Sequence, residues 1–279
     1  MVSASGGTKT LPIEVLDDAI VASRRAAAWI AEVARLAIEE RGRFVMALSG
    51  GNTPLQMLLR LATETIDWSN VHLLQVDERV APLGSPARNL SQLRVALLAR
   101  VPIPVGQVYP MPVEELDLIA AADGYGRLLN EVAGSPPHLD LVQLGLGADG
   151  HTASLLPGDA AAEMASADVA VTAHYNGWRR MTLTFPVINR ARRILWLVTG
   201  AQKAAAVARL ASSDDSLLAS RVRRESALLL VDQAAATGLA VHELGLALSR
   251  PGYVRQRTDA GGEYPLSFDP PWGRSQHED

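Results

Sequence analysis

The chain has 279 residues, of which 48% are hydrophobic and 20% are charged, and its formal net charge at pH 7 is −4. This composition is that of a globular protein with room for one large α/β domain. Lys and Arg number 26 against 30 Asp and Glu, with no basic block, so no nucleic-acid partner is expected. The chain has no cysteine, which excludes disulfides, thiolate nucleophiles and Cys-ligated metals.

The N-terminal residues lack a charged start that leads into an apolar run, so no secretory leader is expected. No stretch approaches the ~18 apolar residues that a membrane span requires. We therefore expect a soluble, cytoplasmic protein without a membrane partner. The oligomeric state stays open.

The first predicted element is an amphipathic helix over residues 17–40, with Gly42 as its stop. The apolar run 44–48 then predicts a buried strand. Thr53, Pro54 and Gln56 follow in the form of a capping box with proline at the first helical position, so we expect a helix from Pro54 to about Leu61.

The same alternation continues along the chain. Apolar runs predict further strands over residues 71–76, 139–144, 181–185, 194–198 and 227–231, and an alanine-rich helix follows Lys203. Nearly continuous apolar strands that alternate with helices indicate an α/β fold with a mostly parallel, doubly wound sheet covered on both faces. We expect residues 1–248 to form a single catalytic domain. Residues 249–279 are rich in Pro and Gly and are expected to be a polar extension.

Unusual residues collect where four predicted strands end. They are Ser-Gly-Gly from Ser49, Asp-Glu-Arg from Asp77, Asp-Gly-His from Asp149, and a glycine followed by Lys203. Ligands of open α/β sheets bind outside the carboxyl ends of the strands. One shared site is therefore a simpler prediction than four unrelated loops.

The loop of Ser49, Gly50, Gly51 and Thr53 is a candidate phosphate cradle. Its glycines allow close approach of the backbone, its two hydroxyls can donate, and the helix that follows presents free N–H groups. A plain strand-to-helix turn with a threonine cap is the alternative. Lys203, in the first turn of a helix where a cation opposes the dipole, makes sense if an anion binds there, and Arg180 is placed to reach the same anion.

His151 is the candidate general base, because Asp149 stands two residues away and a carboxylate can fix the tautomer of an imidazole and raise its basicity. A metal is not expected, since no second ligand stands at helical spacing. Ser154 is conceivable as a nucleophile, but the Gly-x-Ser-x-Gly elbow is missing. Arg79 is a candidate for holding anionic or carbonyl oxygens, with a carboxylate to position it; a merely polar strand end is the alternative.

These residues occur in motifs that resemble a known family. Residues 145–158, with the run His-Thr-Ala-Ser from His151, are very similar to the signature of the 6-phosphogluconolactonases. The segments from Ser49, from Asp77 with Asn89, from Arg180 and from Thr199 resemble the other segments of that family in order. The resemblance runs from about residue 12 to 238.

The resemblance implies a three-layer α/β sandwich shared with glucosamine-6-phosphate deaminases and ribose-5-phosphate isomerases. It implies hydrolysis of 6-phosphoglucono-1,5-lactone in the oxidative pentose phosphate pathway, without metal or organic cofactor. His151 would activate water, Asp149 would orient it, and Arg79 would hold the substrate or the developing oxyanion. The implied substrate-binding residues are Ser49, Gly50, Gly51, Thr53, Asp77, Asn89, Arg180 and Lys203.

Two positions depart from related patterns. Arg88 stands where this family often has serine, and it is expected at the lip of the site with a possible phosphate or hydroxyl contact. Leu156 stands where the deaminases have a glutamate that supports ring opening. An isomerase or deaminase acting on glucosamine 6-phosphate is therefore the nearest alternative, but it lacks a needed group. A non-catalytic sugar-phosphate sensor is the second alternative, although a sensor would not require Asp149 and His151.

Overall fold

The structure is a computed structural model that describes residues 11–240. The expected C-terminal extension, residues 249–279, lies outside the described residues, as does the proposed domain boundary at residue 248.

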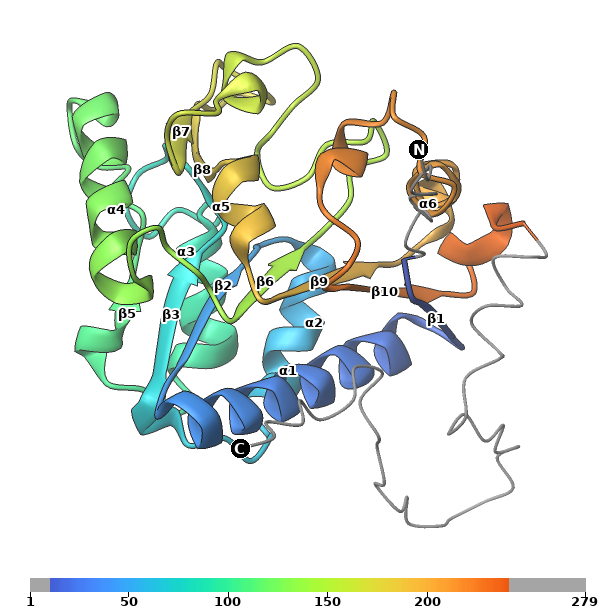
Figure 1. Cartoon of the computed structure of the whole chain (residues 1–279), viewed down its shortest axis with the longest axis horizontal. Helices are drawn as coiled ribbons and strands as arrows, with labels where there is room; N and C mark the ends of the chain where they lie inside the picture. Colours follow the sequence, from blue (N-terminus) through green and yellow to red (C-terminus); the bar gives the residue numbers. More distant parts are fainter. Residues whose placement is uncertain (1–10, 241–279) are drawn as a thin grey trace, which may run out of the picture.

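A seven-stranded parallel sheet forms the centre of the molecule (Figure 1). All six pairs of neighbouring strands are parallel. From one edge to the other the strands are β1 (Ile13–Leu16), β10 (Ala227–Asp232), β9 (Arg193–Val198), β6 (Leu141–Leu144), β2 (Phe44–Leu48), β3 (Val71–Gln75) and β5 (Val108–Tyr109). The four strands β9, β6, β2 and β3, which precede the candidate motifs, are adjacent and parallel, so their carboxyl ends lie at one edge of the sheet, as predicted.

The order of the strands places a switch point between β2 and β6. The chain runs from β2 outward through β3 to β5, and then returns to the other side of β2 to build β6, β9 and β10. Helices that follow the two neighbouring strands leave in opposite directions at such a point, which opens a crevice beyond the strand ends. Ser49 follows β2 and Gly145 follows β6, so both begin their loops at this crevice.

A second, three-stranded antiparallel sheet lies beyond the carboxyl ends of these strands, in the order β4 (Asp77–Arg79), β8 (Arg180–Leu183) and β7 (Val169–Val171). The sequence interpretation of Asp77–Arg79 as the polar end of the preceding strand was wrong. These residues form a strand of their own, because their backbone pairs with β8 from Asp77↔Thr182 to Arg79↔Arg180. Arg180 is accordingly the first residue of strand β8. This strand ends at Leu183, earlier than the predicted strand 181–185, because Phe185 already begins helix α5.

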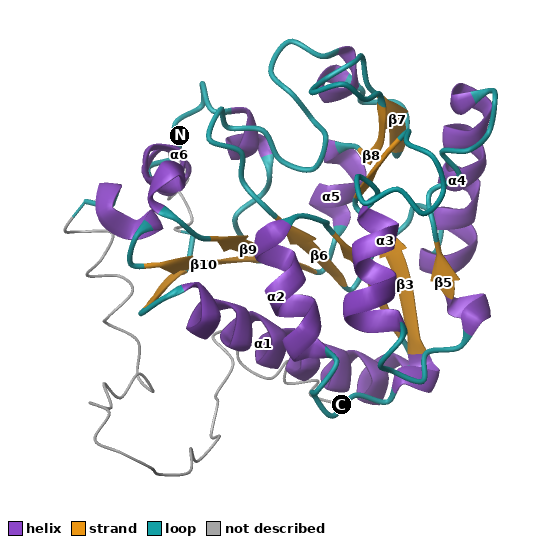
Figure 2. Ribbon diagram, turned by 180° about the vertical axis from the view of Figure 1, so that it is seen from behind, coloured by secondary structure: helices purple, strands orange, loops and turns teal. Residues whose placement is uncertain are grey.

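The helices cover both faces of the parallel sheet (Figures 1 and 2), which gives three layers. They are α1 (Ala19–Arg41), α2 (Asn52–Leu61), α3 (Asn89–Leu93), α4 (Leu118–Ala133), α5 (Phe185–Arg190) and α6 (Ala204–Ala211), and a π-helical turn (Arg94–Leu98) continues α3. Short 3₁₀ segments lie at Trp68–Asn70, Val105–Gln107, Ala160–Glu163, Ala201–Lys203, Leu218–Arg221 and Ala235–Gly238.

The two faces of strand β2 show how the sequence supports two cores. All five of its residues are buried, and alternate side chains point to opposite faces. Phe44 and Met46 belong to the core under α1, α2 and α3, whereas Val45 and Ala47 belong to the core under α4, α5 and α6. A strand that is buried on both faces has no side chain exposed to water, and its sequence is therefore an unbroken apolar run.

The ends of the helices follow local chemistry. Asp18 caps α1 by accepting from the amides of Ile20 and Val21 at 2.8 Å each, and Gly42 ends it with a left-handed φ of 72°. The predicted start of α2 was wrong. The helix begins at Asn52 after Gly51, and Thr53 does not cap it, because its hydroxyl instead meets that of Thr199 at 3.0 Å.

Within residues 11–240, none of the helices combines the length and the apolar composition that crossing a bilayer would take.

Candidate active site

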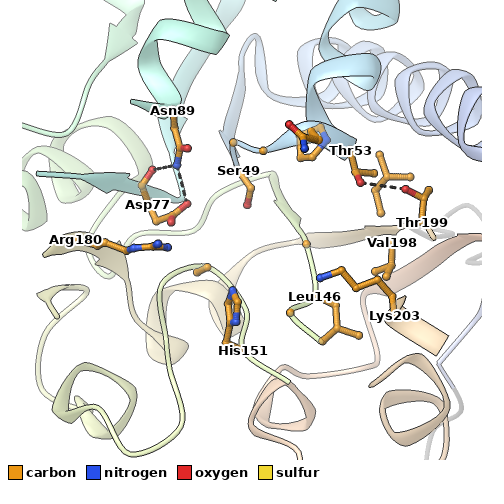
Figure 3. A pocket seen from close by; sticks show the side chains of 18 of the residues that line it. Ser49, Thr53, Asp77, Asn89, Leu146, His151, Arg180, Val198, Thr199 and Lys203 are labelled. Atoms are coloured by element: carbon orange, nitrogen blue, oxygen red, sulfur yellow. Dashed lines mark hydrogen bonds between the residues drawn. The ribbon is translucent and has the colours of Figure 1, made fainter. Parts of the chain in front are cut away.

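A cavity of about 360 Å³ opens at the switch point, between the loops that follow β2, β6 and β9 and the edge of the small sheet. Of the catalytic and substrate-binding residues that the family resemblance implies, all line it except Asp149, which is hydrogen-bonded to His151. The predicted residues among its lining are Ser49, Gly50, Gly51, Thr53, Asp77, Arg79, Asn89, His151, Arg180 and Lys203. Figure 3 shows Arg180 and Lys203 extending into the cavity from opposite sides, with His151 and Ser49 between them.

The Ser-Gly-Gly loop is held by side chains from two neighbouring elements. Gln143 of β6 accepts from the Ser49 amide at 3.2 Å, and its own carbonyl oxygen accepts from the Ser49 hydroxyl at 2.9 Å. Gln92 of α3 accepts from the Gly51 amide at 2.9 Å. The hydroxyl proton of Ser49 is therefore engaged with β6.

Gly50 is glycine for a steric reason. A Cβ on this residue would lie 2.2 Å from Oδ1 of Asn89 and 2.7 Å from its Cβ. The loop and the start of α3 are thus packed against each other without room for a side chain, which brings Asn89 to the cavity wall.

The opposite wall of the cavity offers donors suited to an anion. Asn52 and Thr53 begin α2, ahead of its first backbone bond from Leu55 N to Gly51 O, so their amides have no helical acceptor. One of the hydroxyls of Thr53 and Thr199 donates a hydrogen bond to the other. The proton of the accepting hydroxyl is therefore available to a ligand. Lys203 adds a cation whose pKa is lowered by burial, an effect that Asp149 opposes.

His151 and Asp149 form a hydrogen-bonded pair. Nδ1 of His151 lies 2.6 Å from Oδ1 of Asp149, and the His151 amide donates to the same oxygen at 3.3 Å. Burial acts to raise the pKa of Asp149, but the hydrogen bond and charge of His151 outweigh it and lower that pKa below 3.8. An ionised carboxylate only accepts, so the ring nitrogen that faces it, Nδ1, carries a proton, and in the neutral imidazole Nε2 then holds the lone pair.

Gly147 makes room for this pair. A Cβ there would lie 2.1 Å from Nδ1 of His151 and 2.3 Å from Oδ1 of Asp149. The Gly147 amide also donates to the His151 carbonyl oxygen at 2.8 Å, which closes the loop on itself. The glycine-rich sequence before His151 is thus what allows the imidazole and the carboxylate to fold back over the loop.

Arg79 is oriented by Asn89 and by the backbone. Its guanidinium donates to Oδ1 of Asn89 at 3.1 Å and to the carbonyl oxygen of Ala87 at 2.7 Å. Asn89 in turn donates to Asp77, at 2.9 Å to the backbone oxygen and at 3.2 Å to the carboxylate. The carboxylate expected to position Arg79 therefore acts through an asparagine.

Asp77 is buried between Ser154 and Asn89. The Ser154 hydroxyl donates to its second carboxylate oxygen at 2.5 Å, and Arg180 donates to Ser154 at 3.4 Å. Burial raises the pKa of Asp77, against the effect of the Ser154 hydrogen bond and of Arg180. Ser154 is fully buried and does not line the cavity, so the geometry does not support it as a nucleophile.

The expectation for Arg88 was wrong. Its side chain is 1% exposed and lies outside the cavity lining, where it cannot reach a ligand. It lies 3.2 Å from Glu78 and 2.8 Å from Glu114, and it donates to the carbonyl oxygen of Ala81 at 3.0 Å. Arg88 is turned inward because Glu78 is a buried carboxylate that needs a cation.

Glu78 itself was not singled out from the sequence. Its two oxygens accept from the amides of Arg79, Asn89 and Leu90 at 2.8 Å each, and from Gln75 at 2.9 Å. It therefore fastens β4 to the start of α3. The available signal was weak, because Glu78 stands between two other charged residues, Asp77 and Arg79, directly after an apolar run. Gln143 stood out only as a polar residue within the predicted strand 139–144, and Gln92 carried no signal, because the partners of both lie far away in the chain.

Within the part of the chain that the structure describes, no group of three or more His, Asp or Glu side chains is arranged to hold a metal ion.

Comparison with known proteins agrees with this geometry. The model of the family described as glucosamine-6-phosphate isomerases/6-phosphogluconolactonase matches residues 17–230. The chain therefore belongs to this family, and within it this chain is an α/β protein whose cavity lies at the switch point of a parallel sheet.

The individual proteins that the chain matches have more specific names than the family model. The chain is 37% identical over 241 residues to a 6-phosphogluconolactonase of Mycobacterium tuberculosis, a match that covers 81% of this chain and 98% of that protein. A solved structure of 6-phosphogluconolactonase from Trypanosoma brucei is 27% identical, with a TM-score of 0.74 over 82% of this chain and 99% of that one. A monomeric glucosamine-6-phosphate deaminase, 20% identical with a TM-score of 0.72, shares the fold.

Proposed function

We propose that this chain hydrolyses 6-phospho-D-glucono-1,5-lactone to 6-phosphogluconate. The observation that carries the proposal is a hydrogen-bonded imidazole–carboxylate pair in the same cavity as an anion cradle. The names of the relatives support the same activity.

The phosphate of the substrate is proposed to bind at the start of α2. There the free amides of Asn52 and Thr53, the positive end of the helix and the Lys203 ammonium converge. Gly50 and Gly51 let the backbone approach the phosphate oxygens, and Ser49 keeps the loop in place through β6. Arg180 approaches the cavity from the opposite side (Figure 3) and supplies a second cation.

The lactone carbonyl is proposed to lie between His151 and Arg79. Nε2 of His151 accepts a proton from water as the water oxygen bonds to the carbonyl carbon. The resulting oxyanion is held by Arg79, which is already oriented by Asn89 and Ala87 and so needs little reorganisation. When the bond from the carbonyl carbon to the ring oxygen breaks, that oxygen takes the proton from His151 and becomes a hydroxyl. Water is consumed and the imidazole returns to its neutral form.

Asp149 is proposed to orient His151 and to stabilise the imidazolium that forms during the reaction. Because hydrogen bonding keeps the pKa of Asp149 below its ordinary value, the carboxylate remains ionised throughout the neutral pH range. Asp77 and Asn89 are proposed to fix the wall that carries Arg79 and Arg180.

A deaminase reaction on glucosamine 6-phosphate is less well supported. The residue in the position of the deaminase glutamate is Leu156, which is 6% exposed and has no group that exchanges a proton. Ring opening and deamination would therefore lack one of their acid–base groups.

The test compares wild type with His151→Ala on freshly generated lactone, against a blank without protein. Loss of a general base predicts a fall in kcat of ~10²-fold or more. Glucosamine 6-phosphate is run in parallel with ammonia release as the readout. Hydrolysis by the wild type no faster than the blank refutes the proposed activity, and unchanged hydrolysis by the variant refutes the role of His151.

A further inference from the structure

Tyr175 contacts three of the proposed site residues without lining the cavity itself. Its hydroxyl donates to Oδ2 of Asp149 at 3.3 Å. Its ring packs edge-on against the imidazole of His151, with 5.9 Å between the ring centroids and 68° between their planes. The guanidinium carbon of Arg180 lies 5.2 Å from the centroid of the same ring.

Tyr175 is placed there by a tight hairpin between β7 and β8. Tyr175 and Trp178 pair across a turn whose two central residues, Asn176 and Gly177, have φ values of 49° and 84°. Two successive positive φ values with the sequence Asn-Gly are the signature of a type I′ turn. The chain reaching the hairpin is also tied down, because Asp159 accepts from the Ala173 amide at 2.9 Å.

We propose that Tyr175 is a positioning residue that holds the His151–Asp149 pair and Arg180 in one arrangement. This inference rests on the proposed function. It adds a residue that the cavity lining does not reveal, and it assigns a task to the hairpin.

The hydroxyl is inferred to act on the pair. Oδ1 of Asp149 is engaged with His151, and the Asp149 side chain is 44% exposed, so its other oxygen is accessible to water. A donor from Tyr175 on Oδ2 opposes rotation of the carboxylate, and this keeps Oδ1 in line with Nδ1. Such outer hydrogen bonds are known to orient imidazoles that act in catalysis or on metals.

The ring is inferred to act on both neighbours. It limits the tilt of the imidazole, and its face attracts the guanidinium of Arg180. Arg180 needs such a support, because its Nε is buried without a hydrogen-bond partner and its contact with Ser154 is long at 3.4 Å. The charged groups around this cluster are Asp149, Lys203, Asp77 and Arg79.

The two actions predict different kinetic effects. Tyr175→Phe removes the hydrogen bond and keeps the ring, so kcat falls about 3- to 10-fold with KM unchanged. Tyr175→Ala also releases Arg180, so KM rises as well, by about 2- to 5-fold. Phenylalanine at this position therefore restores KM but not kcat.

Trp178→Ala is the matched control. It removes an aromatic ring from the facing position of the same hairpin, yet Trp178 makes none of the three contacts described for Tyr175. Its kcat and KM are expected to stay within twofold of wild type. Equal losses in the Trp178 and Tyr175 alanine variants would mean that the hairpin as a whole matters, and would overturn the inference.

A second readout does not depend on activity. The Nδ1 proton of His151, bonded to Asp149 at 2.6 Å, should give a far-downfield NMR resonance, assigned by its loss in His151→Gln. We expect it to stay unchanged in Trp178→Ala, to shift upfield in Tyr175→Phe, where the hydrogen bond to Asp149 is lost, and to broaden by exchange with water in Tyr175→Ala. Wild-type kinetics and an unchanged resonance in a folded Tyr175→Ala refute the positioning role. A wild type that does not hydrolyse the lactone refutes the proposed function, and the resonance still decides the role of Tyr175.

Discussion

At the scale of single residues, the site depends on groups that are small as much as on groups that react. Gly50 and Gly147 each stand where a Cβ would collide with a site residue, Asn89 in one case and the His151–Asp149 pair in the other. Neither has a positive φ, so the reason for glycine is space and not backbone conformation.

Gly147→Ala is therefore expected to displace the His151–Asp149 pair. The added carbon would lie 2.1 Å from Nδ1 and 2.3 Å from Oδ1, and both side chains must move. A displacement of about 1 Å in a catalytic group can cost ~10²-fold in rate, so we expect kcat to fall by ~10-fold or more with a smaller change in KM. The measurement is steady-state hydrolysis of the lactone.

Gly126→Ala is the control for that variant. Gly126 lies within α4, and nothing lies within 4 Å of the position a Cβ would take. Alanine there is expected to leave kcat unchanged and to raise the free energy of unfolding by ~0.5–1 kcal/mol. A Gly147→Ala variant as active as this control would show that the pair adapts to the added carbon at no cost.

At the scale of elements, the candidate phosphate loop is braced from both sides by segments distant in sequence. Gln92 of α3 reaches the Gly51 amide, and Gln143 of β6 reaches both the amide and the hydroxyl of Ser49. The loop is therefore held in place before a ligand arrives, and its ordering does not have to be repaid on binding.

Gln92→Leu tests this bracing. Leucine keeps most of the volume but accepts no hydrogen bond, which frees the Gly51 amide and loosens the loop. We expect KM to rise about 3- to 10-fold with kcat changed less than twofold, because the His151–Asp149 pair lies on another loop. Calorimetric titration with 6-phosphogluconate should show the same loss of affinity. A fall in kcat without a change in KM would place Gln92 in a different role.

At the scale of the whole molecule, the site exists because separate strands end together. β2, β6 and β9 deliver the candidate phosphate loop, the His151 loop and Lys203 to one crevice, while the small sheet adds Asp77, Arg79 and Arg180. The proposed anion site thus combines cations that lie far apart in the chain. The affinity of this site for an anion should therefore depend on pH through the cation that loses its proton at the lowest pH.

The lowered pKa of Lys203 determines in which direction this affinity changes with pH. Burial lowers its pKa below 10.5, and a bound phosphate dianion favours the protonated amine. Affinity for 6-phosphogluconate should therefore be constant at neutral pH and should fall as the pH rises through the lowered pKa, before 10.5 is reached. The product is used because the lactone hydrolyses on its own in alkali.

The matched variants are Lys203→Arg and Lys203→Met. Arginine stays charged over this range, so its affinity should not fall, whereas methionine should bind weakly at every pH. Calorimetric titrations between pH 7 and the alkaline limit of the folded protein decide the matter. If the wild type and the arginine variant lose affinity together, the titrating group is not Lys203.

The sequence by itself determined the elements that local chemistry dictates. Strands buried on both faces have apolar sequences, Gly42 ended the first helix, and the segments after four strands carried most of the predicted residues that meet in the cavity. Parallel strands bring their carboxyl ends to one edge, so this convergence could be predicted without coordinates.

Only the tertiary structure decided what depends on distant partners. Asp77–Arg79 became a strand because β8 pairs with it, and Thr53 lies inside α2, where it bonds to Thr199 instead of capping the helix. Arg88 turned inward because Glu78 is buried beside it, and Tyr175 reached Asp149 because an Asn-Gly turn folds the β7–β8 hairpin toward the site. In each case a hydrogen bond or an ion pair between residues far apart in sequence outweighs the local preference of the chain. The fold, and not the neighbouring residues, determines which partners meet.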